Sequence, residues 1–222
     1  MAWLLDLLLP PHCVACRRAG PVLCDGCRRM LVRLRAPLCE RCGAPTEWPV
    51  ARCRECSRRR LAFGSARAAV VYTGVAPALV RAWKERGLRL LATVAAELVV
   101  EVVPRPAADV ITYIPPDGDR SVKRGHQPAR DLARALGERW SLPVTSLLER
   151  TGPVARQTGL TRVQRRRNVR GAFRAATARV PPRIVLVDDV YTTGATADAA
   201  ASALRTAGAE HVLVLTFARA VR

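Results

Sequence analysis

Four Cys-x-x-Cys pairs lie within the first quarter of this chain and constrain its fold more than any other feature. The eight cysteines fall between residues 13 and 56 of a 222-residue sequence, and no cysteine follows them. A Cys-x-x-Cys turn points two thiolates at one cation, and two such turns complete a tetrahedral Cys₄ zinc site. Four turns therefore suit two structural zinc ions, with these ligands: Cys13, Cys16, Cys24, Cys27, Cys39, Cys42, Cys53 and Cys56.

Disulfides and redox pairs are the two alternatives to zinc. Disulfides are typical of secreted chains, and the apolar stretch 1–11 lacks the basic start and the cleavage site of a secretion signal. Four copies crowded between residues 13 and 56 argue against a redox pair. We expect sequential pairing, with residues 13–27 on one ion and 39–56 on the other; a crossed pairing or the loss of one ion stays open. Zinc would supply the folding energy that this segment, poor in large apolar residues, lacks.

The charge is strongly basic, and arginine dominates it. The 37 basic residues comprise 35 arginines and only two lysines, Lys84 and Lys123, and the formal net charge is +19. One interpretation is a codon bias that favours arginine and alanine; the other is a phosphate-rich partner, because the arginine fork binds phosphate oxygens in pairs. The two interpretations stay open together. No apolar run approaches the roughly 20 residues that span a bilayer, so we expect a cytoplasmic protein without a membrane span.

From about residue 63 the pattern changes to apolar strands that alternate with helices. Such alternation predicts an α/β fold with a parallel sheet flanked by helices. We therefore expect two domains, a zinc module over 1–62 and an α/β domain over 63–222. The strands are expected at 68–72, 110–114, 144–148, 184–187 and 212–217, and the helices at 77–86, 88–103, 127–139 and 195–207.

The strongest chemical signal follows the apolar run 184–187. Two carboxylates, Asp188 and Asp189, leave this strand, and the sequence Thr-Thr-Gly-Ala-Thr over 192–196 leads into a helix. Backbone N–H groups at a helix start bind phosphate, and a glycine lets the backbone approach closely. Acids one step away accept hydrogen bonds from sugar hydroxyls. The layout suits a ribose 5-phosphate, and the alternative is a solvated acid pair before an ordinary strand–helix turn.

This stretch resembles the phosphoribosyl-pyrophosphate (PRPP) motif of type I phosphoribosyltransferases. The likeness to one family extends further: the paired Cys-x-x-Cys turns, the Trp83-Lys84 segment, Arg124-Gly125 after a Pro-rich turn, and the later Gly171-Ala-Phe173 all resemble the ComF family. The resemblance covers almost the whole chain. It implies a double zinc ribbon followed by a type I phosphoribosyltransferase-like domain. One departure is His126, which stands where the family has an aromatic residue.

The resemblance also implies roles for particular residues. Asp188 and Asp189 would be the catalytic acids, holding the ribose hydroxyls beside a Mg²⁺ that PRPP carries. The turn 115–120 would approach the pyrophosphate. The residues implied in PRPP binding are Lys84, Arg124, Asp188, Asp189, Val190, Tyr191, Thr192, Thr193, Gly194, Ala195 and Thr196.

Three functions remain open on the sequence. The first is a Mg²⁺-dependent phosphoribosyltransferase with an unknown acceptor, linked to DNA uptake. The second is a non-catalytic protein that binds single-stranded DNA or competence and recombination proteins, and the third is a PRPP-responsive regulator. The basic stretch 151–171 is interpretable as a lid, a solvated charge run or a nucleic-acid contact. The oligomeric state is left open.

Overall fold

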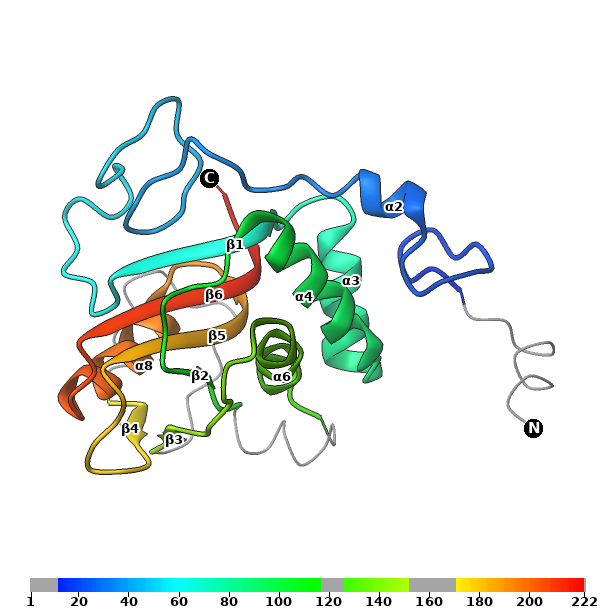
Figure 1. The fold of residues 1–222 in the computed structure, drawn as a ribbon. Coiled ribbons are helices and arrows are strands. Elements are labelled where there is room, and N and C mark those ends of the chain that lie inside the picture. Colours follow the sequence, from blue (N-terminus) through cyan, green and yellow to red (C-terminus); the bar gives the residue numbers. More distant parts are fainter. Residues whose placement is uncertain (1–11, 117–125, 152–170, 222) are drawn as a thin grey trace.

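The structure, a computed structural model, describes residues 12–116, 126–151 and 171–221 (Figure 1). In these ranges four strands form one parallel sheet, in the order β1-β6-β5-β2. Because all four strands run the same way, their carboxyl ends meet at one edge, where ligands bind in such sheets. The strands are β1 (Ser65–Val71), β6 (His211–Arg219), β5 (Arg183–Tyr191) and β2 (Val110–Tyr113).

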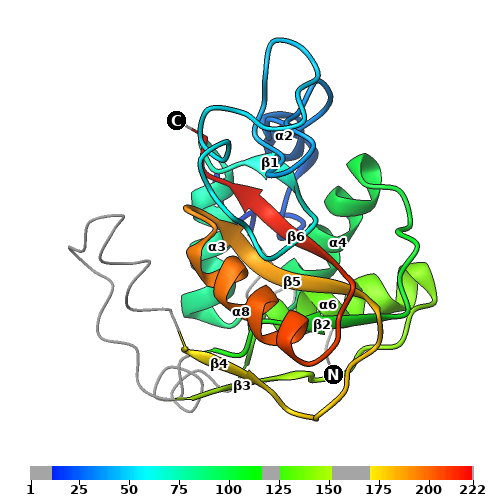
Figure 2. The same cartoon turned by 90° about the vertical axis from the view of Figure 1, so that its left-hand side faces the viewer.

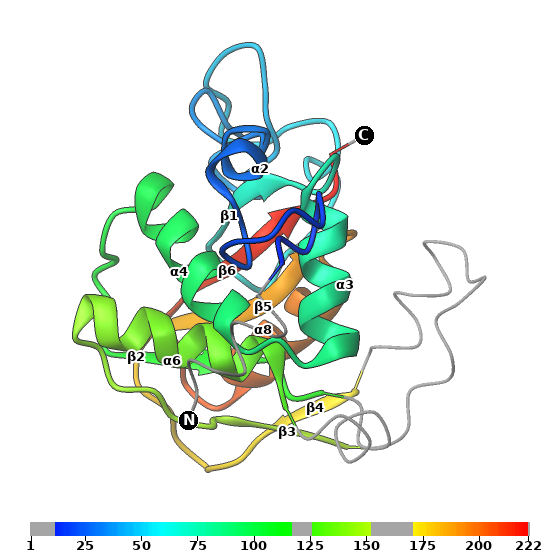
Figure 3. The ribbon, with the colours of Figure 1, turned by 90° about the vertical axis from the view of Figure 1, so that its right-hand side faces the viewer.

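Helices cover both faces of this sheet. One face carries α3 (Ala76–Arg86), α4 (Leu90–Val102) and α6 (Pro128–Trp140), and the other carries α8 (Ala195–Thr206) (Figures 2 and 3). The run Ile184–Val187 in β5 is at most 1% exposed, as expected for a strand that is covered on both faces. The expected α/β class with a parallel sheet and flanking helices is therefore confirmed.

The cysteine-rich segment packs along the open side of β1. The backbone N–H of Leu34 donates to the carbonyl of Ala69 (2.9 Å), and the N–H of Val71 donates to the carbonyl of Val32 (2.8 Å). An uncovered edge strand invites pairing with another chain, so this segment protects the sheet. The segment also contains a short helix, α2 (Asp25–Arg29), which the sequence pattern did not indicate.

Each half of the cysteine-rich segment joins a different core. Cys13 and Cys27 pack with α3, α4 and α6 on one side of the sheet. Cys39, Cys42 and Cys56 pack with Phe63 and α8 on the other side. The two halves are therefore attached to opposite faces of the same sheet.

Two expectations about strands were wrong. The strand expected at 144–148 lies instead at β3 (Leu148–Arg150), which pairs antiparallel with an unanticipated strand, β4 (Phe173–Ala175). Val144 makes only an isolated parallel bridge to Ile111, with hydrogen bonds from the N–H of Ile111 to the Pro143 carbonyl and from the N–H of Thr145 to the Ile111 carbonyl. The central strand, expected to end at Val187, continues to Tyr191 because β6 pairs with it along this whole length. No helix in the described ranges is long and apolar enough to cross a membrane.

Candidate functional site

The eight cysteines form two groups of four, in the sequential order expected. Cys13, Cys16, Cys24 and Cys27 gather in one group, and Cys39, Cys42, Cys53 and Cys56 in the other, with all sulfurs of a group within 4.8 Å of one another. The sulfurs of Cys42 and Cys53 lie 3.4 Å apart, and those of Cys16 and Cys24 lie 3.7 Å apart. Tetrahedral zinc with Zn–S bonds of about 2.3 Å separates its sulfurs by about 3.8 Å. The donor sets therefore fit structural zinc, and these distances are far longer than a disulfide bond.

The thiols of each group differ sharply in acidity. Burial opposes ionisation of Cys13, but backbone N–H groups of Cys16 and Cys24 outweigh it and lower the pKa of Cys13 to about 6. Burial and the neighbouring sulfurs raise the pKa of Cys27 to about 12 and that of Cys56 to about 11. At this spacing four thiolates repel one another, so all four can be ionised only when a cation lies between them. A metal site requires this ionised state of its ligands.

The paired acids lie inside β5 instead of following it. The Oδ1 atom of Asp188 accepts the backbone N–H of Asp189 (2.8 Å), and both residues are partly buried. Burial, reinforced by the neighbouring Asp189 carboxylate, raises the pKa of Asp188 to about 7, although Lys84 opposes this rise. A cation or hydroxyl donors placed beside Asp188 would stabilise its charged form.

Lys84 reaches this acid pair from α3. Its Nζ lies 2.7 Å from Oδ1 of Asp189, and the Asp189 side chain is only 14% exposed. Burial lowers the pKa of Lys84, but the Asp189 and Asp188 carboxylates outweigh it and raise that pKa above its usual value. The structure thus brings together three of the residues implied in PRPP binding, from two distant segments.

The loop after β5 turns directly into α8. Gly194 has φ +71° and precedes Ala195, the first helical residue. A Cβ atom on Gly194 would collide with the hydroxyl end of the buried Tyr191 ring, so a side chain here would require that ring to move. The hydroxyl of Thr193 accepts the N–H of Ala195 (3.3 Å). Of the other residues implied in phosphate binding, Val190 lies near the end of β5, Thr192 is exposed in the turn, and Thr196 lies in the first turn of α8.

Other expected site residues fall outside the described ranges. These are Arg124, the turn beyond Pro116 and most of the basic stretch 151–171. His126 is described and buried, and its Nε2 lies 2.6 Å from the carbonyl oxygen of Trp83, next to Lys84. His126 therefore braces the segment that carries Lys84.

Two arginines that sequence reasoning missed hold the loop from the side of the cysteine groups. Arg59 donates from Nη1 to the carbonyl of Thr193 (2.8 Å). Arg219, at the end of β6, is 2% exposed, and its guanidinium lies 4.5 Å from the centre of the Tyr191 ring. A lone arginine at the end of the largely apolar run 212–218 was the one signal that pointed to Arg219.

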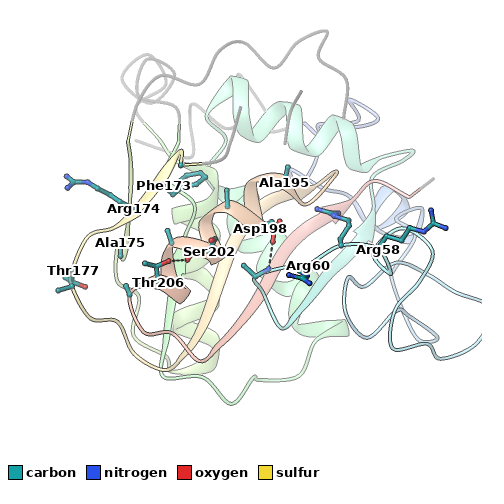
Figure 4. A pocket seen from close by; sticks show the side chains of 17 residues that line it. Arg58, Arg60, Phe173, Arg174, Ala175, Thr177, Ala195, Asp198, Ser202 and Thr206 are labelled. Atoms are coloured by element: carbon teal, nitrogen blue, oxygen red, sulfur yellow. Dashed lines mark hydrogen bonds between the residues drawn. The ribbon is translucent and has the colours of Figure 1, made fainter. Parts of the chain in front are cut away.

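A cavity of about 800 Å³ runs along the outer side of α8. Arg58 and Arg60 lie on one side of it and Phe173 and Arg174 on the other, with Asp198 of α8 between them (Figure 4). The carboxylate of Asp198 accepts a hydrogen bond from the backbone N–H of Ala62 (2.7 Å). Among the charged residues that line this cavity, four are arginines and one is an aspartate.

Comparisons of the sequence with known proteins agree on one family. A double zinc ribbon domain matches residues 4–57. Competence protein F of Haemophilus influenzae is 26% identical, over 94% of this chain and 97% of that protein. DNA utilization protein YhgH of Salmonella typhi is 30% identical, over 96% of this chain and 99% of that protein. The chain belongs to the ComF family.

The solved structures that resemble this ComF protein are more distant. A glutamine PRPP amidotransferase from B. subtilis, complexed with ADP and GMP, is 25% identical over 58% of this chain and 25% of that chain, with a TM-score of 0.37. The TT1426 protein from Thermus thermophilus is 21% identical over 58% of this chain and 72% of that chain, with a TM-score of 0.33.

Proposed function

We propose that this ComF protein binds Mg²⁺-PRPP at the carboxyl edge of its sheet and transfers the phosphoribosyl group to an acceptor. One observation carries the proposal: two partly buried acids and a Thr-Thr-Gly-Ala-Thr loop follow one another at the end of the central strand β5, and the loop opens α8. Ligands of open α/β sheets bind at this edge. The relatives named for competence and DNA utilization support a role in DNA uptake or use.

The loop supplies the phosphate end of the site. Backbone N–H groups from Thr192 to Thr196 lie at the positive end of the α8 dipole, where an anion is stabilised. The threonine hydroxyls add donors. Gly194 lets the backbone of this loop pack directly against the Tyr191 ring, where a side chain would collide.

The acid pair supplies the sugar and magnesium end. Asp188 and Asp189 would accept hydrogen bonds from the ribose hydroxyls and hold the Mg²⁺ that accompanies PRPP. The raised pKa of Asp188 fits this role, because a bound cation favours the charged carboxylate. When bound, Mg²⁺ neutralises charge on the pyrophosphate leaving group.

Transfer of the phosphoribosyl group needs positively charged groups near carbon 1 of the ribose and the exclusion of water from it. That carbon becomes cationic as pyrophosphate leaves, so a nearby ammonium favours departure of the anion. Lys84, which pairs with Asp189, supplies such an ammonium beside the acid pair, and Arg124 is expected to assist it. The site must also exclude water, since PRPP would otherwise hydrolyse.

Calorimetric titration tests this proposal. Mg²⁺-PRPP is titrated into the zinc-loaded protein and into an Asp188→Ala/Asp189→Ala variant, with Asp109→Ala as the control. Asp109 pairs with Arg183 at the opposite end of β5, so its replacement removes an acid far from the site. We expect binding to weaken by at least about tenfold in the double variant only. Absence of binding to the wild-type protein would overturn the proposal.

A second candidate function is binding of single-stranded DNA without catalysis. The basic cavity along α8 favours it, because Arg58, Arg60 and Arg174 line one continuous hollow. Arginines in such a groove contact phosphates and release counterions. Release of pyrophosphate on addition of an acceptor would separate the two functions, since only a transferase produces it.

A further inference from the structure

Arg219 lies between the second cysteine group and the loop after β5. Its Nη1 donates to the carbonyl of Cys42 (2.5 Å), and its Nη2 lies 3.6 Å from the Cys42 sulfur. Nη2 also lies 3.3 Å from the Glu55 carboxylate. A buried guanidinium is costly unless it is paired, so these contacts fix both the charge and the orientation of Arg219.

The same guanidinium supports the loop from below. It lies 4.5 Å from the centre of the Tyr191 ring, within the range of a cation–π contact. The Tyr191 hydroxyl in turn occupies the space that a side chain at position 194 would need. The position of the Tyr191 ring therefore limits how closely the backbone at Gly194 can pack against it.

Two further contacts join the second cysteine group to this loop. Arg59 follows Cys56 by three residues, and it donates to the carbonyl of Thr193. The N–H of Ala62 donates to Asp198 in the first turn of α8. The second group is thus attached to the loop and to the start of its helix at three points.

The first cysteine group is attached elsewhere. Arg28, beside Cys27, pairs with Glu97 (3.0 Å) and Glu101 (2.5 Å) of α4. Cys13 and Cys27 belong to the core on the α3 and α4 side of the sheet. The two groups have the same ligands, and therefore provide a matched comparison within one chain.

We propose that Arg219 is a positioning residue that couples the second Cys₄ site to the phosphate-binding loop. A cation in that site would keep the Cys42 turn in place, Arg219 would transmit this order to Tyr191, and the loop would be held ready for the phosphate. The inference rests on the proposed function for its PRPP measurement. It predicts that the second metal site controls the order of the loop, and through it PRPP affinity, and that the first metal site does not control the order of the loop.

The first test compares Arg219→Met and Arg219→Lys with Arg183→Met in the full chain. Arg183 starts β5 at the opposite edge, so its replacement removes the same charge without touching the loop. Hydrogen–deuterium exchange of residues 190–196 is measured without any ligand, alongside zinc retention against a chelator. We expect faster exchange in Arg219→Met, a partial effect in Arg219→Lys because the charge remains without the fork, and no change in Arg183→Met. Zinc retention should fall about 10–100-fold in Arg219→Met, the usual effect of removing a group that orients a metal ligand.

The second test compares Cys53→Ala with Cys16→Ala. Each variant removes one ligand from one group, and both retain Cys42, the cysteine that Arg219 contacts. We expect Cys53→Ala to speed exchange in the loop and to weaken Mg²⁺-PRPP binding at least about tenfold, and Cys16→Ala to leave exchange in the loop close to wild type. Circular dichroism of each variant confirms that the α/β body is folded.

The outcomes separate the two proposals. Unchanged loop exchange in Arg219→Met and Cys53→Ala would overturn the coupling even if wild-type protein binds PRPP. Equal effects of Cys16→Ala and Cys53→Ala on loop exchange would also overturn it, because the coupling is specific to the second group. If wild-type protein does not bind PRPP but the exchange pattern is as expected, the proposed function fails and the coupling stands.

Discussion

Lys84 and Asp189 form a 2.7 Å ion pair between α3 and the carboxyl end of β5. The pair brings one of only two lysines in an arginine-rich chain to the acids beside the proposed phosphate loop. An ammonium at this point compensates the charge of two adjacent carboxylates. Ligand binding would therefore have to redistribute this contact.

Removing the lysine should destabilise the protein through the carboxylate left behind. In Lys84→Met, Asp189 loses its cation while its side chain stays largely buried. We expect the free energy of unfolding to fall by about 1–2 kcal/mol. The expected loss is small for a buried pair because Lys84 is about one-third exposed, so water screens the interaction. Urea unfolding measures it. The double variant Lys84→Met/Asp189→Asn should recover part of the loss, and an equal or greater loss there would contradict the ion-pair account.

The pH dependence of stability should reflect Asp188. Its pKa in the folded protein is raised to about 7, so the folded state binds more protons than the unfolded state between about pH 4 and pH 7. The contribution of Asp188 to stability is thus present at low pH and is lost as the pH rises through this window. Thermal unfolding of wild type and Asp188→Asn measures the slope, which should be smaller in the variant. Parallel pH profiles would show that Asp188 titrates normally.

The affinity for Mg²⁺-PRPP should change in the opposite sense. Binding requires the charged Asp188 carboxylate, so affinity should rise from about pH 6 to about pH 8. PRPP itself ionises in this pH range, and this affects the measured affinity of wild type and of Asp188→Asn equally. The difference in affinity between the two proteins therefore reports on Asp188. A rise of the same size in both proteins would assign the effect to PRPP alone.

Gly194 should tolerate alanine less well than Gly208, a glycine with positive φ and no close neighbours. Gly208 has φ +104° and open space around it, so Gly208→Ala should cost about 1–2 kcal/mol from the backbone alone. Gly194→Ala adds a collision with Tyr191, and we expect an additional cost of about 1–3 kcal/mol. Denaturant unfolding measures both. Similar losses of stability in the two variants would mean that the Tyr191 ring moves aside.

Metal analysis should find about two zinc ions per chain. The eight thiols should resist a thiol reagent in the native protein and become reactive after chelation and unfolding. A metal-free protein whose 12–62 segment remains folded would contradict the zinc interpretation.

DNA binding should depend on the arginines of the α8 cavity. In Arg58→Ser/Arg60→Ser, the slope of log affinity for single-stranded DNA against log salt should fall by about 0.7 for each phosphate that is no longer neutralised. Arg183→Ser at the opposite edge of the sheet is the control. Equal slopes in all three proteins would place the DNA-binding surface elsewhere.

The sequence by itself determined the parts of this protein whose information is local. Cysteine spacing specified two Cys₄ groups, because each turn carries its own pair of ligands. The fully apolar run 184–187 specified a central strand, and the Thr-Thr-Gly-Ala-Thr stretch specified a loop that opens a helix. The amphipathic helix expected at 127–139 forms at 128–140, since Leu132 and Leu136 recur at helical spacing and are buried.

Only the tertiary structure decided which distant segments meet. β5 continues past Val187 through two acids, against their strand propensity, because the neighbouring β6 pairs with them. The sequential grouping of the cysteines was expected, but the packing of the two halves of the segment on opposite faces of the sheet decides it against the crossed alternative. The contacts of Lys84 with Asp189 and of Arg219 with Cys42 join residues more than 100 positions apart. Such contacts arise from the burial of charged groups that must find partners, and a linear pattern does not encode which partner the fold brings near.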